Sequence, residues 1–404
     1  MAKIAVMGYG VVGSGVVEVL HKNHDSIAKK AKEEISVKYI LDLRDFPEDP
    51  NRDLFIKDFS IIENDPEVEV VVECIGGQNP AYDFVKRSLL AGKNVATSNK
   101  ELIATRGAEL LKTARDKGVN LLFEASVGGG VPIIRPLHQC LAANEVCEIA
   151  GIVNGTTNFI LSKMKNENMA FDDALKLAQD LGYAEKIDPS ADIDGHDSCR
   201  KICILSSLAF GSHIYPDMVY TRGIRDITPT DITCAESNNY AVKLIAKTKR
   251  LPDGAVSAAV TPALVSHDSQ LAGVEDVFNA ILVRGDVLGD VVFYGRGAGK
   301  LPTASAVVAD VIDLVQNRGT YKGLFWNDVD RENFHPFSEE NVRCYVRFSG
   351  QNPFPDATAL GGRLPEGQQA VITPELPFGE VESRLKQAKS QGTQVHNMMP
   401  VLDY

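Results

Sequence analysis

The chain lacks the residue patterns of a metal centre, a disulfide framework or a nucleic-acid-binding surface. Its seven cysteines show no C-x-x-C spacing, and their odd number predicts free thiols in a reducing compartment. Its eight histidines form no H-E-x-x-H or paired-ligand pattern, which argues against a transition-metal site. With 42 basic and 54 acidic residues, the formal charge of -12 argues against the basic face that nucleic acids and anionic membranes require.

Long apolar runs are also missing. The most apolar stretch, Ile4 to Leu20, contains four glycines and Glu18 and has no basic leader, so we expect neither a signal peptide nor a membrane span. The chain has no internal repeat and no low-complexity tract. Its 44% hydrophobic and 24% charged residues are typical of a globular protein, and 404 residues allow two or three domains. We therefore expect a soluble, cytoplasmic protein.

The segment 178–201 holds a dense group of six carboxylates. Asp197 lies four residues before Lys201, and this spacing puts both side chains on one face of a helix. Glu185 and Asp192 lie upstream, where glycines and a proline predict a loop. Such a segment suits a ligand with a cationic amine and an oxygen that needs a proton. A solvated acidic loop with a helix ion pair, stabilising by only ~0.3–0.5 kcal/mol, would show the same spacing.

The amino terminus carries a G-x-G-x-x-G pattern. A short strand, Ile4 to Met7, leads into Gly8, Gly10 and Gly13, and a helix and a second strand, Ser36 to Leu41, follow. The first glycine allows a tight turn, the second lets a pyrophosphate approach the backbone, and the third allows close packing of helix on strand. The phosphate then meets the N-terminus of the helix. This context favours dinucleotide binding over a glycine-rich turn without a ligand.

Strands alternate with helices up to about residue 135, which predicts right-handed crossovers and a parallel sheet. The further strands expected here are Val68–Cys74, Asn94–Thr97 and Asn120–Glu124, each followed by a helix, from Pro80, Lys100 and Val131 respectively. Ligands of such sheets bind at the carboxyl ends of the strands. Topology therefore places Lys100 near the nicotinamide end of a bound dinucleotide.

After Glu145 the pattern changes to an α+β domain with a mostly antiparallel sheet, which could pair across a dimer. Its expected strands include two that flank a P-D-G turn, then Val277–Arg284 and Asp290–Tyr294. The helix Leu301–Val315 is expected to return to the first domain. The predicted domains are a dinucleotide-binding domain (1–135, completed by a helix at about 301–318), a catalytic and dimerisation domain (136–300), a linker (317–336) and a tail (337–404).

These blocks resemble the homoserine dehydrogenase family. The signature positions in 178–201 are matched, and G-I-V-N-G-T-T-N-F-I-L, E-A-S-V-G-G-G-V-P-I-I and G-A-G-K-L-P-T-A-S-A-V-V-A-D are similar to three further family blocks. The resemblance covers roughly residues 1–320. It implies an α/β fold with a Rossmann domain and a dimerising catalytic domain. It also implies reversible reduction of L-aspartate 4-semialdehyde to L-homoserine with NADPH or NADH, in threonine and methionine biosynthesis.

The resemblance also implies roles for individual residues. Lys201 would be the general acid and Lys100 a second lysine beside the reacting oxygen; a helix ion pair and a strand-end cap are the alternatives. The implied substrate-binding residues are Glu185, Asp192, Asp197, Thr156 and Tyr183. The implied cofactor-binding residues are Gly8, Gly10, Val11, Val12, Gly13, Asp42, Arg44, Ile75, Gly76, Lys100, Gly182, Gly299 and Thr303. Glu124, Val127, Gly129 and Val131 match a loop that can hold sodium through backbone oxygens, although a hydrogen-bonded turn would look the same.

Cofactor choice depends on the end of the second strand. Asp42 could accept the ribose hydroxyls of NAD, whereas Arg44 could pair with the 2′-phosphate of NADP. We favour NADP. A non-catalytic dinucleotide-sensing or amino-acid-sensing regulatory protein is the alternative function.

Two features depart from the family pattern. E-K-I-D-P has one residue more between Glu185 and the Asp-Pro pair than many members have. The tail resembles only part of an ACT domain, a βαββαβ amino-acid sensor: a strand from Val342, a helix Glu380–Lys389 and a closing strand are expected, but the first helix is replaced. We therefore expect a reduced, ACT-like appendage.

Overall fold

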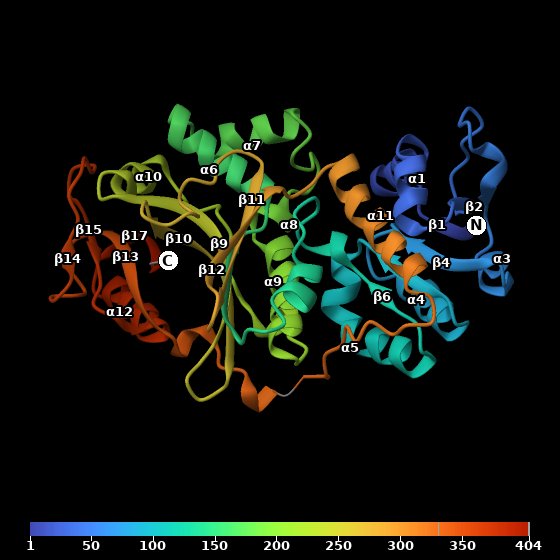
Figure 1. Cartoon of the computed structure of the whole chain (residues 1–404). Helices are drawn as coiled ribbons and strands as arrows, with labels where there is room; N and C mark the ends of the chain where they lie inside the picture. Colours follow the sequence, from blue (N-terminus) through green and yellow to red (C-terminus); the bar gives the residue numbers. More distant parts are fainter. Residues whose placement is uncertain (330, 403–404) are drawn as a thin grey trace. The chain divides into compact units, whose positions relative to one another are not determined.

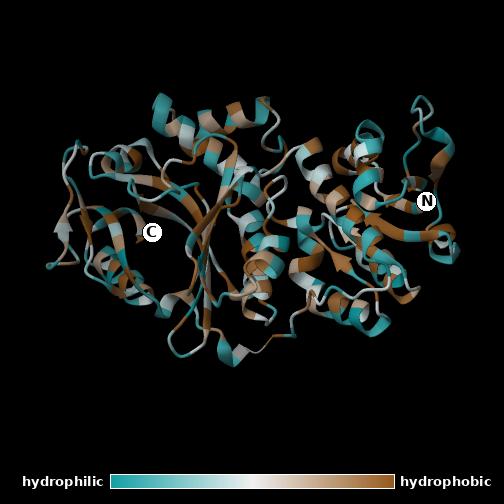
Figure 2. Cartoon of the chain, in the orientation of Figure 1, coloured by the Kyte–Doolittle hydropathy of each residue, from teal (hydrophilic) through white to brown (hydrophobic). Residues whose placement is uncertain are grey.

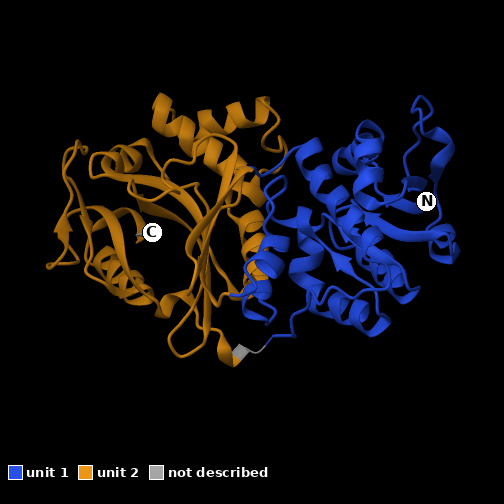
Figure 3. Cartoon of the chain, in the orientation of Figure 1, with its two compact units in different colours: residues 1–143, 207–215, 296–329 blue, residues 144–206, 216–295, 330–404 orange. Residues whose placement is uncertain are grey.

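The computed structural model describes residues 1–329 and 331–402, which form two units of dense internal contact (Figure 3). Unit 1 comprises residues 1–143, 207–215 and 296–329. Unit 2 comprises residues 144–206, 216–295 and the described chain after residue 330. The two units thus meet in the chain at residue 143, and the described part of the tail belongs to unit 2. Residue 330 of the predicted linker and residues 403–404 of the predicted tail lie outside the described residues.

Unit 1 is built on a parallel sheet (Figure 1). Its strands lie in the order β3 (Phe55–Ile56), β2 (Ile35–Leu41), β1 (Ala2–Met7), β4 (Val68–Glu73), β5 (Asn94–Thr97) and β6 (Leu121–Leu122). The chain order reverses between β1 and β4, which is where dinucleotides bind to such sheets. Both strands are almost continuous runs of buried apolar residues, as a sheet covered on both faces requires.

The helices of unit 1 are α1 (Val11–Lys22), α2 (His24–Ala31), α3 (Ser60–Asn64), α4 (Ala81–Leu90), α5 (Lys100–Lys117) and α11 (Lys300–Gln316). The late helix α11 packs on α1 within unit 1. Gly15 makes this approach possible. A Cβ at Gly15 would lie 2.9 Å from the carbonyl oxygen of Lys300 and 3.1 Å from Cβ of Ala304.

The prediction for residues 120–140 is partly wrong. The strand is only two residues long, and the helix expected from Val131 begins at residue 134 and continues as a π-helix over Pro136–Cys140. The carboxylate of Glu124 accepts the backbone N–H groups of Ile133, Ile134 and Arg135. The first N–H groups of a helix have no partner inside the helix, so Glu124 caps the helix at this point and places its start after Val131.

Unit 2 is built on a mixed sheet of eleven strands among the described residues. The main path runs β12 (Gly289–Arg296), β11 (Phe278–Gly285), β7 (Val146–Ile152), β9 (Tyr240–Arg250), β10 (Val256–Ser266), β17 (Gln394–Leu402), β13 (Asn341–Ser349), β15 (Gln368–Ile372) and β14 (Thr358–Ala359), with β8 (Tyr220–Thr221) on β10 and β16 (Leu376–Pro377) on β13. The expected hairpin at the P-D-G turn is confirmed by the antiparallel β9–β10 pair.

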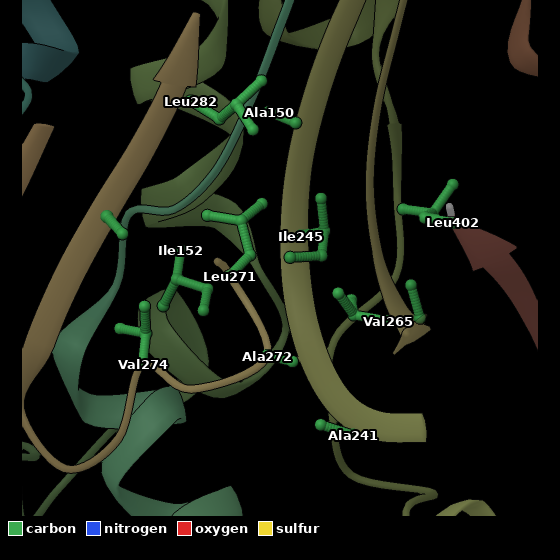
Figure 4. Packing of buried hydrophobic residues seen from close by; sticks show 12 residues of the cluster. Ala150, Ile152, Ala241, Ile245, Val265, Leu271, Ala272, Val274, Leu282 and Leu402 are labelled. Carbon is green, nitrogen blue, oxygen red and sulfur yellow. The ribbon is translucent and has the colours of Figure 1, made fainter. Parts of the chain in front are cut away.

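One face of this sheet carries an apolar core (Figure 4). Ile152 of β7, Ile245 of β9 and Leu282 of β11 pack there with Leu271 and Val274 from the connection after β10. Figure 2 shows hydrophobic colour on strands of both sheets, whereas the helices alternate between hydrophilic and hydrophobic stretches. This pattern is typical of amphipathic helices that cover a sheet.

The helices of unit 2 are α6 (Gly155–Glu167), α7 (Phe171–Asp180), α8 (Ser190–Ile193), α9 (His196–Phe210), α10 (Pro229–Glu236) and α12 (Phe378–Ser390). The segment expected to be a loop before α9 therefore contains one short helix, α8, which carries Asp192. The end of α9 contributes residues 207–210 to unit 1. No helix of the described residues is both long enough and apolar enough to cross a bilayer.

The tail has the strand, helix and closing strand that the sequence predicts. β13 pairs antiparallel with β15, and residues 350–366 between them contain only β14. β17 extends the main sheet by pairing in parallel with β10, at Leu264 with Val401 and at Val265 with Leu402. A buried ion pair between Arg347 of β13 and Asp231 of α10, at 2.8 Å, fixes the tail to the rest of unit 2. The ACT-like character of the tail stays a prediction.

We expect Gly13→Ala to destabilise the protein by about 1–3 kcal/mol, because the new Cβ would lie 1.9 Å from the carbonyl oxygen of Gly8. Gly10→Ala is the matched control, since a Cβ at Gly10 meets nothing within 4 Å. Thermal unfolding followed by circular dichroism should show a lower Tm for G13A only. Equal Tm values for the two variants would contradict this account of the turn.

Candidate functional site

The glycine-rich turn of unit 1 has room for a phosphate. Gly8 adopts φ +88°, and a Cβ there would lie 2.8 Å from the carbonyl oxygen of Cys74 at the end of β4. Gly10 caps α1 and faces open space. The helix begins with Val11 and Val12 and has no acidic residue in its first turn, so its N–H groups and dipole favour an anion.

Asp42 and Arg44 form one unit at the end of β2. The Asp42 carboxylate accepts the backbone N–H of Tyr9 at 2.7 Å and that of Arg44 at 2.9 Å. It also accepts Nε and Nη2 of Arg44, at 3.0 and 2.9 Å. The Arg44 guanidinium holds the pKa of Asp42 well below its usual range. The Arg44 side chain is 62% exposed and therefore remains accessible to a ligand.

A buried carboxylate, Glu73, organises the turn after β4. Its side chain is fully buried and accepts the backbone N–H groups of Ile75 at 2.7 Å and Gly76 at 3.2 Å. It also accepts the hydroxyl of Thr97, at the end of β5, at 2.5 Å. Burial raises the pKa of Glu73. This residue therefore connects the two predicted cofactor positions Ile75 and Gly76 with the neighbouring strand.

Asn99 extends this network to Lys100. Its backbone N–H donates to the Thr97 hydroxyl at 2.9 Å, and its amide donates to the carbonyl of Gly77 at 2.6 Å. Its side-chain oxygen caps α5 by accepting the N–H of Leu102. Lys100, the first residue of α5, is thus fixed by a cap that contacts the turn after β4. The sequence reasoning missed Glu73 and Asn99; an asparagine directly before a predicted helix was the available signal for Asn99.

The predicted cation loop is held by α11. The backbone N–H of Glu124 donates to Asp310 at 2.9 Å, and Arg135 pairs with Asp310 at 2.7 Å. Burial and the nearby Glu124 carboxylate raise the pKa of Asp310 to about 8. Because three backbone N–H groups occupy the Glu124 carboxylate, a cation here would bind to backbone oxygens.

The other residues predicted for this loop lie in a tight turn, and those predicted for the start of α11 are its N-cap and its first turn. Val127 and Val131 are buried, and Gly129 adopts φ +57°, where a Cβ would lie 2.1 Å from the carbonyl oxygen of Gly297. Gly299 caps α11 at φ +125° and accepts the backbone N–H of Thr303 at 3.1 Å. Within residues 1–329 and 331–402, no three His, Cys, Asp or Glu side chains are grouped to hold a metal ion.

In unit 2, Lys201 is a buried ammonium with fixed partners. Its Nζ donates to the carbonyl of Val153 at 2.6 Å and pairs with Asp197 at 2.8 Å, one helical turn earlier on α9. Asn154, directly after Val153, donates from its amide to Asp197 at 2.8 Å and to Asp192 at 2.7 Å. The structure therefore brings together three residues that the sequence predicted, Lys201, Asp197 and Asp192, through one that it did not.

The remaining predicted substrate residues lie beside α6. Thr156, in the first turn of α6, donates its hydroxyl to the carbonyl of Tyr183 at 2.7 Å, and the Tyr183 ring meets Phe159 edge-on at 5.1 Å. Gly182 adopts φ +77° in the turn that ends α7. Glu185 is exposed, and no hydrogen bond of the described residues joins its side chain to Lys201.

Two family models match the chain. Residues 8–124 match the NAD-binding domain of homoserine dehydrogenase, and residues 132–312 match homoserine dehydrogenase itself. The homoserine dehydrogenase of Pseudomonas aeruginosa is 42% identical over 315 residues, which are 78% of this chain and 72% of that protein.

Solved structures agree with these matches. A homoserine dehydrogenase from Thiobacillus denitrificans has a TM-score of 0.89 at 32% identity, over 100% of this chain and 98% of that chain. A hyperthermophilic archaeal homoserine dehydrogenase in complex with NADPH has a TM-score of 0.66 at 29% identity, over 78% of this chain and 97% of that chain.

We expect Glu73→Ala to destabilise the protein by at least ~2 kcal/mol, because two backbone N–H groups and a hydroxyl lose their buried acceptor. Glu73→Gln should lower the free energy of unfolding by less, since the glutamine amide keeps one oxygen as a hydrogen-bond acceptor. Urea unfolding measures both effects. Glu67→Ala is the control, because Glu67 is an exposed carboxylate whose ion pairs with Lys3 and Lys38 are screened by water. If E73A lowered the free energy of unfolding by no more than E67A does, the role of Glu73 would be contradicted.

Proposed function

The chain belongs to the homoserine dehydrogenase family, and we propose that Lys201 donates the proton to the aldehyde oxygen of L-aspartate 4-semialdehyde. The protein is an NAD(P)-dependent oxidoreductase that acts on a CH-OH group. The observation that carries the proposal is the fixed position of the Lys201 ammonium between the carbonyl of Val153 and the carboxylate of Asp197.

The chemistry requires a positive donor at the reacting oxygen. The nicotinamide dinucleotide, when bound, supplies the hydride. Negative charge then builds on the aldehyde oxygen, and a nearby N–H donor stabilises and neutralises it. A lysine ammonium has three N–H donors. The carbonyl of Val153 and the carboxylate of Asp197 accept two of the N–H groups of Lys201. We therefore assign the third N–H group to the substrate oxygen. In the oxidation direction, the same nitrogen takes the proton back.

We assign the other predicted residues to substrate binding. Lys100 is the second lysine for the reacting oxygen. Asp192, Asp197 and Glu185 hold the substrate ammonium, because a cationic amine is stabilised by carboxylates. Thr156 and Tyr183 bind the other end of the substrate, at the first turn of α6.

The residues of unit 1 fit a dinucleotide. The open space at Gly10 and the free first turn of α1 suit its pyrophosphate. We assign the pyrophosphate to Gly8, Gly10, Val11, Val12 and Gly13. We assign Gly299 and Thr303 to the nicotinamide end. Ile75 and Gly76 of unit 1 and Gly182 of unit 2 are assigned to further contacts with the cofactor.

We infer a preference for NADP over NAD. The Asp42 carboxylate already accepts four N–H groups and is therefore poorly available to a ribose hydroxyl. Asp42 instead orients the exposed Arg44 guanidinium, which can pair with a 2′-phosphate. Lys57 also supports the preference for NADP, because its Nζ contacts the carbonyl of Arg44 and so places a second cation beside Arg44.

Three further assignments complete the proposal. A monovalent cation such as sodium binds the backbone oxygens of residues 124–131, which a dependence of activity on sodium over tetramethylammonium would test. The enzyme is a cytoplasmic homodimer, so light scattering should give twice the chain mass of 43.9 kDa. The tail acts as a reduced ACT-like appendage, and amino-acid titrations followed by calorimetry would test whether it binds a ligand.

Lys201→Ala should lower kcat for aspartate semialdehyde by ~10²–10⁴-fold, because the reaction loses its proton donor. The affinity for the dinucleotide should be kept, because the glycine-rich turn of unit 1 is unchanged. NADPH and NADH absorbance measures the rate, and fluorescence titration measures the affinity. Lys163→Ala is the control: Lys163 forms an exposed ion pair with Glu167 on α6. Equal rates for wild type and K201A would rule out this role for Lys201.

Arg44→Ala should raise KM for NADPH about 10- to 100-fold and leave KM for NADH nearly unchanged, because a charge-assisted bond to the 2′-phosphate is lost. Arg52→Ala, which removes another exposed arginine of unit 1, should change neither value. A similar loss with both dinucleotides would show that Arg44 does not select the phosphate.

A further inference from the structure

Asn154 connects the ionic groups of unit 2. It lies between β7 and α6 and is 6% exposed. Its amide nitrogen donates to Asp192 Oδ1 at 2.7 Å and to Asp197 Oδ2 at 2.8 Å. A side-chain amide has two N–H donors, so both are used by carboxylates from two different helices, α8 and α9.

The orientation of this amide is fixed. Its oxygen caps α6 by accepting the N–H of Thr157 at 2.8 Å. If the amide were flipped, its NH₂ group would face the N–H of Thr157 and its oxygen would face the carboxylates of Asp192 and Asp197. Both contacts would be repulsive, so only one orientation is stable. The preceding residue, Val153, accepts the Lys201 ammonium. Residues 153 and 154 therefore hold the ammonium and both carboxylates from one short segment of backbone.

On the roles proposed above for Asp192, Asp197 and Lys201, we propose that Asn154 is a positioning residue of the dehydrogenase reaction. Its two N–H groups hold the carboxylates of Asp192 and Asp197 side by side, where they would otherwise repel each other. Asp197 is thereby kept within 2.8 Å of the Lys201 ammonium. Asn154 thus acts through these groups and needs no contact with the substrate.

Asn154→Asp separates this role from helix capping. Aspartate has nearly the same shape and keeps the cap oxygen for Thr157, but it removes both N–H donors and adds a carboxylate. We expect kcat/KM for aspartate semialdehyde to fall about 100-fold, with both kcat and KM affected, while Tm changes by only a few degrees. Repulsion among three carboxylates should also move the acid limb of the kcat/KM profile to higher pH.

A matched control lies on the same helix. Asn166, at the other end of α6, is exposed and donates its amide to Glu275 at 3.0 Å. Asn166→Asp makes the same chemical change next to a carboxylate, and it should leave kcat/KM and its pH profile unchanged.

Asn154→Ser is the second variant. A serine hydroxyl can cap α6 but cannot reach both carboxylates, so kcat/KM should fall about 10-fold without added charge. If N154D does not fold, the kcat/KM of N154S tests whether Asn154 is a positioning residue. Wild-type kcat/KM and pH profiles in the folded Asn154 variants would overturn the proposal.

A readout without turnover distinguishes this proposal from the proposed function. The rate at which acetic anhydride acylates Lys201 is followed against pH by peptide mass spectrometry, in wild type, N154D and N154S. A changed pH dependence of acylation in the variants supports the positioning role, whatever the wild-type enzyme reduces. Failure of the wild-type enzyme to reduce aspartate semialdehyde would refute the proposed function but not the positioning role. Identical labelling in all three proteins would overturn the positioning role.

Discussion

The arrangement of unit 2 depends on keeping one buried ammonium group hydrogen-bonded. An ionised group without partners is strongly disfavoured in a protein interior, and removing one partner of a buried pair leaves the other uncompensated. Lys201 therefore needs both the Val153 carbonyl and the Asp197 carboxylate, and Asp197 in turn needs Asn154. These contacts join the end of β7 and the start of α6 to α8 and α9, so the positions of these elements depend on each other.

Unit 1 shows the same need for hydrogen-bond partners at its buried carboxyl groups. The fully buried Glu73 is stabilised by two backbone N–H groups and a hydroxyl, and in return it shapes the turn that ends β4. Asp310 is buried beside Arg135 and accepts the backbone N–H of Glu124. Each carboxylate joins segments that lie far apart in the chain or on neighbouring strands. Buried carboxyl groups thus order the loops at the carboxyl edge of the sheet, where a dinucleotide would bind.

The late helix α11 shows how a distant segment completes unit 1. It packs on α1 through Gly15, where a side chain would collide with Lys300 and Ala304. Its Asp310 also holds the loop of Glu124. The helix therefore stabilises both α1 and the loop of Glu124. The other unit consists of residues 144–206, 216–295 and the described chain after residue 330, with its own sheet and core.

Much of this protein was predictable from local sequence. The alternation of strands and helices, the G-x-G-x-x-G turn and the spacing of Asp197 and Lys201 depend on neighbouring residues, and the expected β5, α5 and β9–β10 hairpin appear in the structure. The predicted start of the helix at Val131 was wrong, because the distant side chain of Glu124 caps the helix at residues 133–135. Such a contact leaves no periodic pattern in the sequence.

The sequence alone determined the order of the elements and the candidate chemistry, because periodicity, turn residues and motif spacing act over a few residues. Only the tertiary structure decided which polar residues share a partner. Glu73 meets Thr97, Asp42 meets Tyr9, and Asn154 meets both Asp192 and Asp197. These partners are 24 to 43 residues apart, and burial, which removes competing water, is what makes each of them necessary.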